Sequence, residues 1–333
     1  MRSAIRNAPL AAMSAAAALL AVSLGQAEAA DGGEWVFDTR LRYESVDQDG
    51  LDDADALTWR ARAGYQTPAW RGFRALAELE GVVHLIDDFN DTVHGRVNER
   101  VIADPEAFEL NRLQVSWSGD GRHSAVLGRQ RIVFGNARFI GNVGFRQNEQ
   151  TFDALRASAQ PFDGAVVSYL YIDRVHRVFG DDSPQGEWDS DSHVLQAEFD
   201  LPIGRLTGYG LLLDFQNAPN QSSQTFGLRW SREWEAGAFR PRMTLEAAQQ
   251  SDYRNNGASF DVGYQHAEVA LRHGRFGAAL GAERLEGDGV RGFSTPLATL
   301  HAFQGWADVF LSTPADGVRD LNARISYALP SSV

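Results

Sequence analysis

Alternate residues of the segment 35–44 fall into two chemically different sets. One set is largely apolar and contains Trp35, Phe37, Thr39, Leu41 and Tyr43. The other set is mostly charged and contains Val36, Asp38, Arg40, Arg42 and Glu44. Because successive side chains of a β-strand point to opposite faces, the segment is predicted to be a strand with one apolar and one charged face. A soluble β-sandwich shows the same alternation. Here it recurs along the whole chain behind an export signal, which indicates a barrel that is apolar outside and wet inside.

The N-terminus has the three parts of a secretory signal. Arg2 and Arg6 give a positive start, residues 11–24 form an apolar run without charge, and small residues end the signal. The apolar run is shorter than the ~20 residues that a membrane-spanning helix needs. We therefore expect residues 1–29 to be a cleaved signal peptide, with a retained helix as the alternative. Residues 30–333 contain no stretch as long as a transmembrane helix, so any membrane insertion must use strands.

All 31 basic residues are arginine, and the chain has no cysteine. Neither disulfides nor thiolate metal sites are possible, and we expect no cofactor. The formal net charge of −13 argues against a nucleic-acid partner. Arginine presents a rigid and always charged fork of donors that suits carboxylates. Acidic loops at 47–55 and 181–191 offer oxygen ligands for calcium, but they lack a fixed ligand spacing and are interpreted as solvated loops.

After residue 34, strands of about ten residues alternate with links that are short and long in turn, and a tilted strand of that length crosses a bilayer. The short links are 68–72, 119–122, 160–164, 202–204, 235–237 and 273–275. The long links are 47–56, 87–107, 132–149, 177–191, 217–223, 252–259 and 286–320. Short periplasmic turns and longer outer loops are typical of outer-membrane barrels. We predict an all-β fold, a transmembrane antiparallel β-barrel of about fourteen strands, with residues 30–333 as a single domain.

The outward sets of the predicted strands carry aromatic residues near the strand ends. These residues are Trp35, Trp59, Tyr65, Trp117, Trp230, Trp234 and Tyr327. Aromatic rings favour the headgroup level of a bilayer, so they are expected to form an interfacial girdle, with a sandwich core as the alternative. In the segment 208–214, the alternation is interpreted as placing Tyr209 and Leu211 outward and Gly208 and Gly210 toward the lumen.

The inward sets of the strands are rich in charge. The lumen is expected to be lined by Arg40, Arg42, Arg60, Arg62, Arg74, Glu78, Asp214, Arg229, Arg242 and Glu246. Around a water-filled lumen such residues form ladders of paired charge, in which surplus arginine favours anions. The alternative is a salt-bridged wall that supports the barrel without selecting a solute. For the set as a whole we expect a preference for anions.

The segment 132–154 is too polar and too rich in glycine to be a strand over much of its length. Its stretch 139–150 combines hydrogen-bond donors, acceptors and flexible glycines. The segment could fold into the pore as a constriction or remain an ordinary outer loop, and composition alone does not decide between them.

Motifs of catalysis are missing from the sequence. It contains no Gly-x-Ser-x-Gly, His-Glu-x-x-His or phosphate-binding loop. His176, Asp181 and Asp182, near the start of a predicted outer loop, are the remaining candidate for a catalytic site. We predict that the protein is not an enzyme.

Several stretches resemble the alginate-export family of outer-membrane porins. They are GRQR at 128–131, RFIGNVGFRQNEQTFDA at 138–154, YIDRVHRVFG at 171–180 and TPLATLHAFQGWAD at 295–308. The resemblance covers nearly all of the mature chain. It implies a monomeric barrel with an arginine-rich conduit for anions, in which the pore-facing positions are Arg129, Arg131, Arg146 and Asp153. In the export system this conduit carries the polyuronate alginate, whereas many relatives resemble general or small-solute porins.

The chain departs from this family at its C-terminus. Relatives commonly have about eighteen strands and end on an aromatic residue, whereas this chain ends at Val333. The resemblance therefore implies a C-terminal truncation. The alternative is a smaller barrel of about fourteen strands, which an even strand count permits.

The sequence thus predicts a passive channel in the outer membrane of a Gram-negative cell. We expect it to be a monomer in contact with outer-membrane lipid, passing anionic, carboxylated solutes or an alginate-like polyuronate. The alternatives are a barrel enzyme acting on lipid or peptide, and a structural barrel with a plugged lumen. Conductance would separate the channel from both alternatives.

Overall fold

The computed structural model describes residues 19–20, 32–47, 50–304 and 310–329. These residues form one antiparallel sheet whose strands follow one another in chain order. The strands are β1 (Leu19–Leu20), β2 (Glu34–Val46), β3 (Ala54–Gln66), β4 (Phe73–Asp88), β5 (Ala107–Ser118), β6 (His123–Gln130), β7 (Thr151–Ala159), β8 (Ala165–His176), β9 (Glu187–Leu201), β10 (Gly204–Leu213), β11 (Ser223–Glu233), β12 (Phe239–Asp252), β13 (Asp261–His273), β14 (Phe276–Leu285) and β15 (Val318–Tyr327). Two single 3-10 turns also occur, η1 (Pro219–Gln221) and η2 (Leu300–Ala302). In the described part of the chain, no helix has the length and apolarity to cross a membrane.

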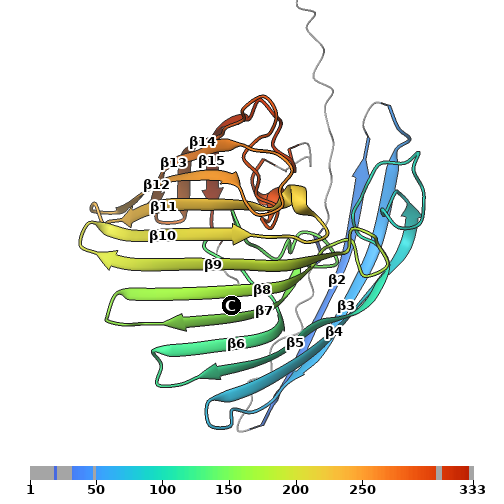
Figure 1. Cartoon of the computed structure of the whole chain (residues 1–333), viewed down its shortest axis with the longest axis horizontal. Helices are drawn as coiled ribbons and strands as arrows, with labels where there is room; N and C mark the ends of the chain where they lie inside the picture. The colour runs from blue at the N-terminus through green and yellow to red at the C-terminus, as the bar shows by residue number, and fades with distance from the viewer. Residues whose placement is uncertain (1–18, 21–31, 48–49, 305–309, 330–333) are drawn as a thin grey trace, which may run out of the picture.

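The sheet is a long, curved meander (Figure 1). Each strand from β2 to β14 pairs with the next one, and β12 pairs with β13 from Phe239↔His273 to Ser251↔Asp261. The predicted all-β antiparallel fold with fourteen strands is confirmed by β2–β15. Among the described residues, β15 pairs only with β14 and no ladder joins it to β2, so the curved sheet is not closed. The count of about eighteen strands implied by the resemblance stays a prediction.

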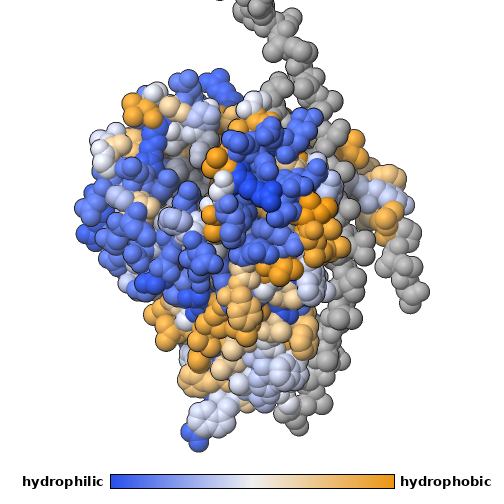
Figure 2. Space-filling model, turned by 90° about the vertical axis from the view of Figure 1, so that its right-hand side faces the viewer, coloured by the Kyte–Doolittle hydropathy of each residue, from blue (hydrophilic) through white to orange (hydrophobic). Residues whose placement is uncertain are grey.

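The two faces of the sheet differ as the alternation predicts. In β3, Trp59 and Tyr65 are 46% and 37% exposed, whereas Arg60 and Arg62 are only 5% and 7% exposed. We call the face with the exposed apolar side chains the outer face, and the opposite face the inner face. Hydrophobic residues gather in one area of the surface beside a broad hydrophilic area (Figure 2). Such gathered apolar surface is typical of contact with lipid or protein rather than with water.

The connections lie at two different ends of the strands. Links of a few residues join β3 to β4, β5 to β6, β7 to β8, β9 to β10, β11 to β12 and β13 to β14. All of these links lie at the same end of the strands, which we call the short-turn end. The loops at the opposite, long-loop end are longer. The β3–β4 link shows why a short turn suffices, because Trp70 and Phe73 exchange two backbone hydrogen bonds of 2.8 and 2.9 Å. Between them Arg71 and Gly72 both have positive φ, 51° and 84°, the geometry of a two-residue hairpin turn.

The predicted orientation of β10 is wrong. Tyr209 and Leu211 were expected on the outer face, but Leu211 is 4% exposed and packs in the inner core with Ile140 and Phe152, and Tyr209 packs against the same core. Gly210 instead faces outward, where an added Cβ would lie 3.1 Å from the ring of Phe226. The reason is that part of the inner face is covered by apolar side chains of the β6–β7 loop. Hydrophobic alternation in β10 therefore reports burial under that loop and not contact with lipid.

Candidate functional site

The loop between β6 and β7 folds across the inner face of the sheet. It comprises residues 131–150, and we call it the inner loop. Residues 147–150 are all less than 5% exposed, as is Arg138. The segment is therefore buried on the inner face and is not an ordinary surface loop.

The first anchor of the inner loop is on β2 and β3. Arg40 donates from Nη1 to the carbonyl of Gly144 at 2.8 Å and from Nε to Oε1 of Gln147 at 2.8 Å. Gln147 in turn donates from Nε2 to Oγ1 of Thr58 at 2.8 Å, and its backbone N–H donates to Oδ1 of Asp104 at 2.7 Å. Arg40 thus holds the polypeptide backbone of the loop and does not stand free in the lumen.

The neighbouring arginines of the first anchor are buried and paired with carboxylates. Arg42 pairs with Asp104 and Glu44, Arg60 with Asp38, and Arg62 with Glu80 and Glu149. Arg146 of the inner loop pairs with Glu44 at 3.2 Å. The sequence predicted that these arginines line a lumen with surplus positive charge. The structure does bring them together, but their partners are the inner loop and the carboxylates of the neighbouring strands and of Asp104.

Glu149 is the centre of a second set of contacts. Its oxygens accept from Arg131 Nε at 2.6 Å, Asn111 Nδ2 at 2.9 Å and Asn142 Nδ2 at 2.7 Å. Burial by itself would raise the pKa of this carboxyl group. The hydrogen bond from Arg131 and the charges of Arg62 and Arg131 outweigh it and lower the pKa of Glu149 to about 2. Glu149 therefore stays ionised at neutral pH and secures the C-terminal part of the loop.

The other anchor lies on β14 and the long β14–β15 loop. Arg138 donates from Nε to Glu283 at 2.8 Å and from Nη1 to Thr295 Oγ1 at 3.1 Å. The N–H of Gly141 donates to the carbonyl of Leu297 at 2.8 Å. Arg138 is not among the site residues that the sequence predicted. The available signal was that Arg138 and Thr295 lie in two of the stretches that resemble the alginate-export family, and the structure joins those stretches.

Other predicted site residues lie outside these two anchors. Glu78 does belong to the first anchor region, where it accepts from Asn111 at 2.7 Å and Arg112 at 2.8 Å. Arg74 is exposed near the short-turn end of β4. Asp214 lies beyond the end of β10, buried and 3.6 Å from Arg254.

Two groups of charged residues remain. Arg129 and Asp153 pair at 3.0 Å near the long-loop end, and His176 Nε2 lies 2.9 Å from Asp153. On the inner face near the short-turn end, Arg242 pairs with Glu268 at 2.9 Å. The predicted residues thus form several separate clusters and not one continuous ladder.

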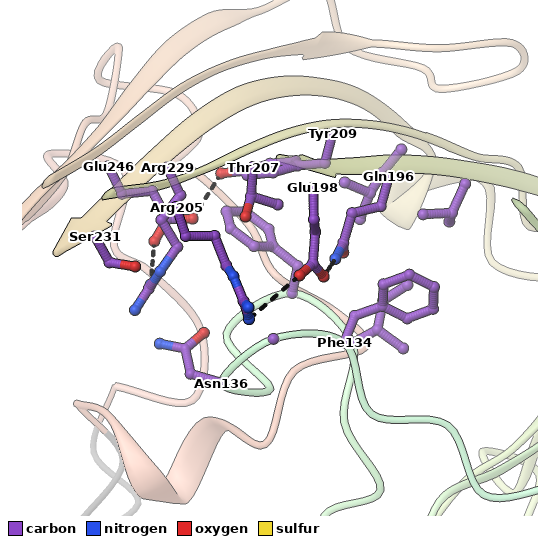
Figure 3. A pocket seen from close by; sticks show the side chains of 15 residues that line it. Phe134, Asn136, Gln196, Glu198, Arg205, Thr207, Tyr209, Arg229, Ser231 and Glu246 are labelled. Atoms are coloured by element: carbon purple, nitrogen blue, oxygen red, sulfur yellow. Dashed lines mark hydrogen bonds and ion pairs between the residues drawn. The ribbon is translucent and has the colours of Figure 1, made fainter. Parts of the chain in front are cut away.

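A cavity of about 320 Å³ lies between the inner loop and strands β9–β12. The loop contributes Phe134, Asn136, Phe139 and Ile140, and the strands contribute Val194, Gln196, Glu198, Arg205, Thr207, Tyr209, Leu211, Arg229, Ser231 and Glu246. Figure 3 shows the charged side chains of the strands facing Asn136 and Phe134 of the loop. Arg229 Nη1 donates to Glu246 Oε2 at 2.6 Å, and the Tyr209 hydroxyl donates to Glu246 Oε1 at 2.8 Å. Both predicted residues, Arg229 and Glu246, therefore line this cavity.

The candidate catalytic residues His176 and Asp181 do not form a hydrogen-bonded pair. His176 is 5% exposed, and its Nδ1 lies 3.9 Å from Oδ1 of Asp181, beyond hydrogen-bonding distance. No group of three or more acidic or histidine residues suited to a metal ion occurs among the described residues.

No family model and no curated protein matches the sequence. Solved structures of outer-membrane porins have a similar fold. OccK9 (OpdG) of Pseudomonas aeruginosa aligns with a TM-score of 0.69 and 13% identity, over 89% of this chain and 78% of that one. OccK2 (OpdF) of the same organism, in complex with glucuronate, aligns with a TM-score of 0.56 and 15% identity, over 79% of this chain and 67% of that one.

A third porin, OccD3 (OpdP) of Pseudomonas aeruginosa, aligns with a TM-score of 0.58 and 13% identity over 79% of this chain. The chain spans only 59% of the length of that protein. These comparisons identify the fold as that of β-barrel porins, which are channels and not enzymes. They support the resemblance to porins and do not single out alginate export.

Proposed function

We propose that the protein is an outer-membrane channel for small anionic, carboxylated solutes. The observation that carries the proposal is the distribution of side chains over the two faces of one porin-like sheet. The outer face exposes Trp35, Phe37 and Leu79, while the inner face carries ion pairs and the inner loop. An apolar exterior around a charged interior suits a barrel in a bilayer and does not suit a soluble protein.

Arginine on the inner face supports carboxylated solutes. Arg131, Arg205, Arg242 and Arg324 keep at least a third of their side-chain surface accessible although each has a carboxylate partner. A guanidinium group has five donors, so a paired arginine still offers N–H groups to a passing carboxylate. A fold-related porin has been solved in complex with glucuronate, a uronate. Uronates, including short pieces of an alginate-like polyuronate, are therefore the solute class that we propose.

The inner loop is proposed to be the constriction of this channel. It is tied to β2 and β3 by Arg40 and Gln147 and to β14 by Arg138, so it crosses the inner face from one wall to the other. Solutes would pass beside the loop, where the cavity against β9–β12 lies. Passage of a long polyuronate beside the inner loop would need a wider opening than passage of a single uronate.

Reconstitution into planar bilayers tests the function. We expect conductance with a reversal potential that shows a preference for anions at low salt, fading as salt rises because the Debye length falls to about 8 Å at 0.15 M. Glucuronate and an alginate oligomer should partly block the chloride current. Absence of conductance would favour the plugged barrel, and cation selectivity would contradict the proposed solute class.

Orientation and location can be tested in intact cells. We propose a monomer in the outer membrane with the long loops outside and residues 1–29 removed; apart from β1, that segment lies outside the described residues. Cysteine at Val97 or Val290, both more than 70% exposed in long loops, should react with an impermeant thiol reagent. Cysteine at Ile203, 60% exposed in a short turn, should react only after lysis. The opposite labelling pattern would reverse the orientation.

A further inference from the structure

The cavity against β9–β12 changes character along the strands. On the inner face of the β9–β10 ladder, the paired residues run from Val194↔Leu211 to Gln196↔Tyr209 and then Glu198↔Thr207. The long-loop side of the cavity is thus apolar, and its short-turn side is polar and charged. Phe139 of the inner loop adds an aromatic ring that lies 5.0 Å from the ring of Tyr209. A ligand that fits both sides must have an apolar body and a polar head.

The charged groups at the polar side still have unused bonding capacity. Arg229 is bound to Glu246 through one of its three nitrogen atoms, Nη1. Both oxygens of Glu246 already accept a hydrogen bond from a neighbour, one from Tyr209 and the other from Arg229. Glu198 accepts from Gln196 with one oxygen only, and its other oxygen lies 3.8 Å from Arg205 Nη1. One cation and one anion, Arg229 and Glu198, are therefore both available to a ligand.

The lining of the cavity has no net charge. Arg205 and Arg229 contribute two positive charges, and Glu198 and Glu246 contribute two negative charges. A simple anion would gain from Arg229 but would also approach the carboxylate of Glu198, which repels it. A ligand with a cationic and an anionic group can satisfy both residues with charge-assisted hydrogen bonds. Glu198 on β9 and Arg229 on β11 both pair with Thr207 of β10, so they lie on the two strands that flank β10. Figure 3 shows both side chains on the side of the sheet that faces the inner loop.

We propose that this cavity binds a small zwitterion with an apolar or aromatic body, a free amino acid with a hydrophobic side chain. Its carboxylate bonds to Arg229, its ammonium group to Glu198, and its side chain lies against Phe139, Val194 and Leu211. A cavity of about 320 Å³ is at the small end of the usual range for ligand sites, about 300–1,000 Å³, and suits one amino acid better than a peptide. The proposal concerns equilibrium binding and does not depend on anion conduction.

Titration calorimetry on the detergent-solubilised, folded protein tests this proposal with four probes. L-phenylalanine carries the carboxylate, the ammonium group and the apolar body that the proposed site requires. The compound 3-phenylpropanoate lacks the ammonium group, 2-phenylethylamine lacks the carboxylate, and alanine lacks the apolar body. We expect each of these three to bind at least about tenfold more weakly than phenylalanine, since a hydrogen bond to a charged group contributes more than a neutral one. Equal binding of any one of them, or no binding of phenylalanine, would overturn the proposal.

The variant Glu198→Gln gives a sharper readout. It should weaken phenylalanine about tenfold and leave 3-phenylpropanoate unchanged or tighter, because it removes the partner of the ammonium group and the repulsion of the carboxylate. Binding of 3-phenylpropanoate also shows that the variant is folded. Glu233→Gln is the matched control, a carboxylate on the same face of β11 that does not line the cavity. Unchanged phenylalanine binding in Glu198→Gln, or an equal loss in Glu233→Gln, would rule the site out.

Discussion

The wall of β2–β4 and the wall of β9–β12 use the same residue types in opposite ways. On β2 and β3 Arg42, Arg60 and Arg62 are buried, and arginine donors there are taken by carboxylates and by the backbone of the inner loop. On β9–β12 the arginines keep accessible surface beside an open cavity, as Arg205 and Arg229 do. The comparison teaches that the number of arginines on an inner face does not measure the positive charge offered to a solute. Pairing and burial decide which guanidinium groups remain available.

The largest expected effect is that of replacing both Arg60 and Arg62 by glutamine. Glu80 would then lose its buried ionic partner, and breaking a buried pair by removing one member costs about 3–5 kcal/mol. We expect the free energy of unfolding, measured by urea titration in lipid vesicles, to fall by at least about 3 kcal/mol. Single-channel conductance should rise because the inner loop loses contacts at Gln147.

The matched control is Arg242→Gln plus Arg324→Gln, two accessible arginines that share Glu268. Exposed pairs contribute about 0–1 kcal/mol, so this variant should be nearly as stable as the parent. Similar losses in both double variants would mean that the two walls are not different.

Leu211→Ala should have the next largest effect. Leu211 lies in the inner core, and truncation of a buried leucine costs about 2–5 kcal/mol because a cavity is left. Leu195→Ala is the control on the adjacent strand, where the side chain is 55% exposed on the outer face and lipid can fill the space left. Urea titration of both variants compares the two costs. A larger loss for Leu195→Ala would restore the outward orientation that the sequence suggested for β10.

A pH effect should follow from Glu149. Its folded pKa of about 2 lies below the ordinary value of 4.5, so its contribution to docking of the inner loop is fully present above pH 4.5. That contribution is lost as pH falls from about 4.5 through about 2, when the carboxylate is protonated. We expect conductance to rise over this acidic window as the loop is released. Glu149→Gln should show raised conductance already at neutral pH and little further change on acidification.

The smallest expected effect is that of Arg242→Gln alone. Arg242 is half exposed and Glu268 keeps Arg324 as a second partner, so stability should change by less than about 1 kcal/mol. The reversal potential under a salt gradient should shift slightly away from anion preference, because one solvent-accessible cation of the inner face is lost. No shift in Arg242→Gln, together with a large shift in Arg60→Gln plus Arg62→Gln, would show that the buried wall selects the ions after all.

The sequence by itself determined the all-β fold, the strand count and the alternation of short turns and long loops. These features depend on local patterns: side chains alternate with period two in every strand, and turn residues such as Arg71-Gly72 mark the hairpins. The two faces of β3 could likewise be predicted, because Trp59 and Arg60 differ so strongly in hydrophobicity.

Only the tertiary structure decided where the inner loop lies and what it covers. Arg138 meets Glu283 across 145 residues of sequence, and Gln147 meets Thr58 across 89. Such contacts leave no periodic trace in the chain, since either partner alone is an ordinary polar residue. The inner loop also explains why the alternation in β10 was misinterpreted. A position buried under the loop and a position in contact with lipid both favour an apolar side chain such as that of Leu211. Hydrophobicity along a strand records that a side chain leaves water, and only the packed structure shows what replaces the water.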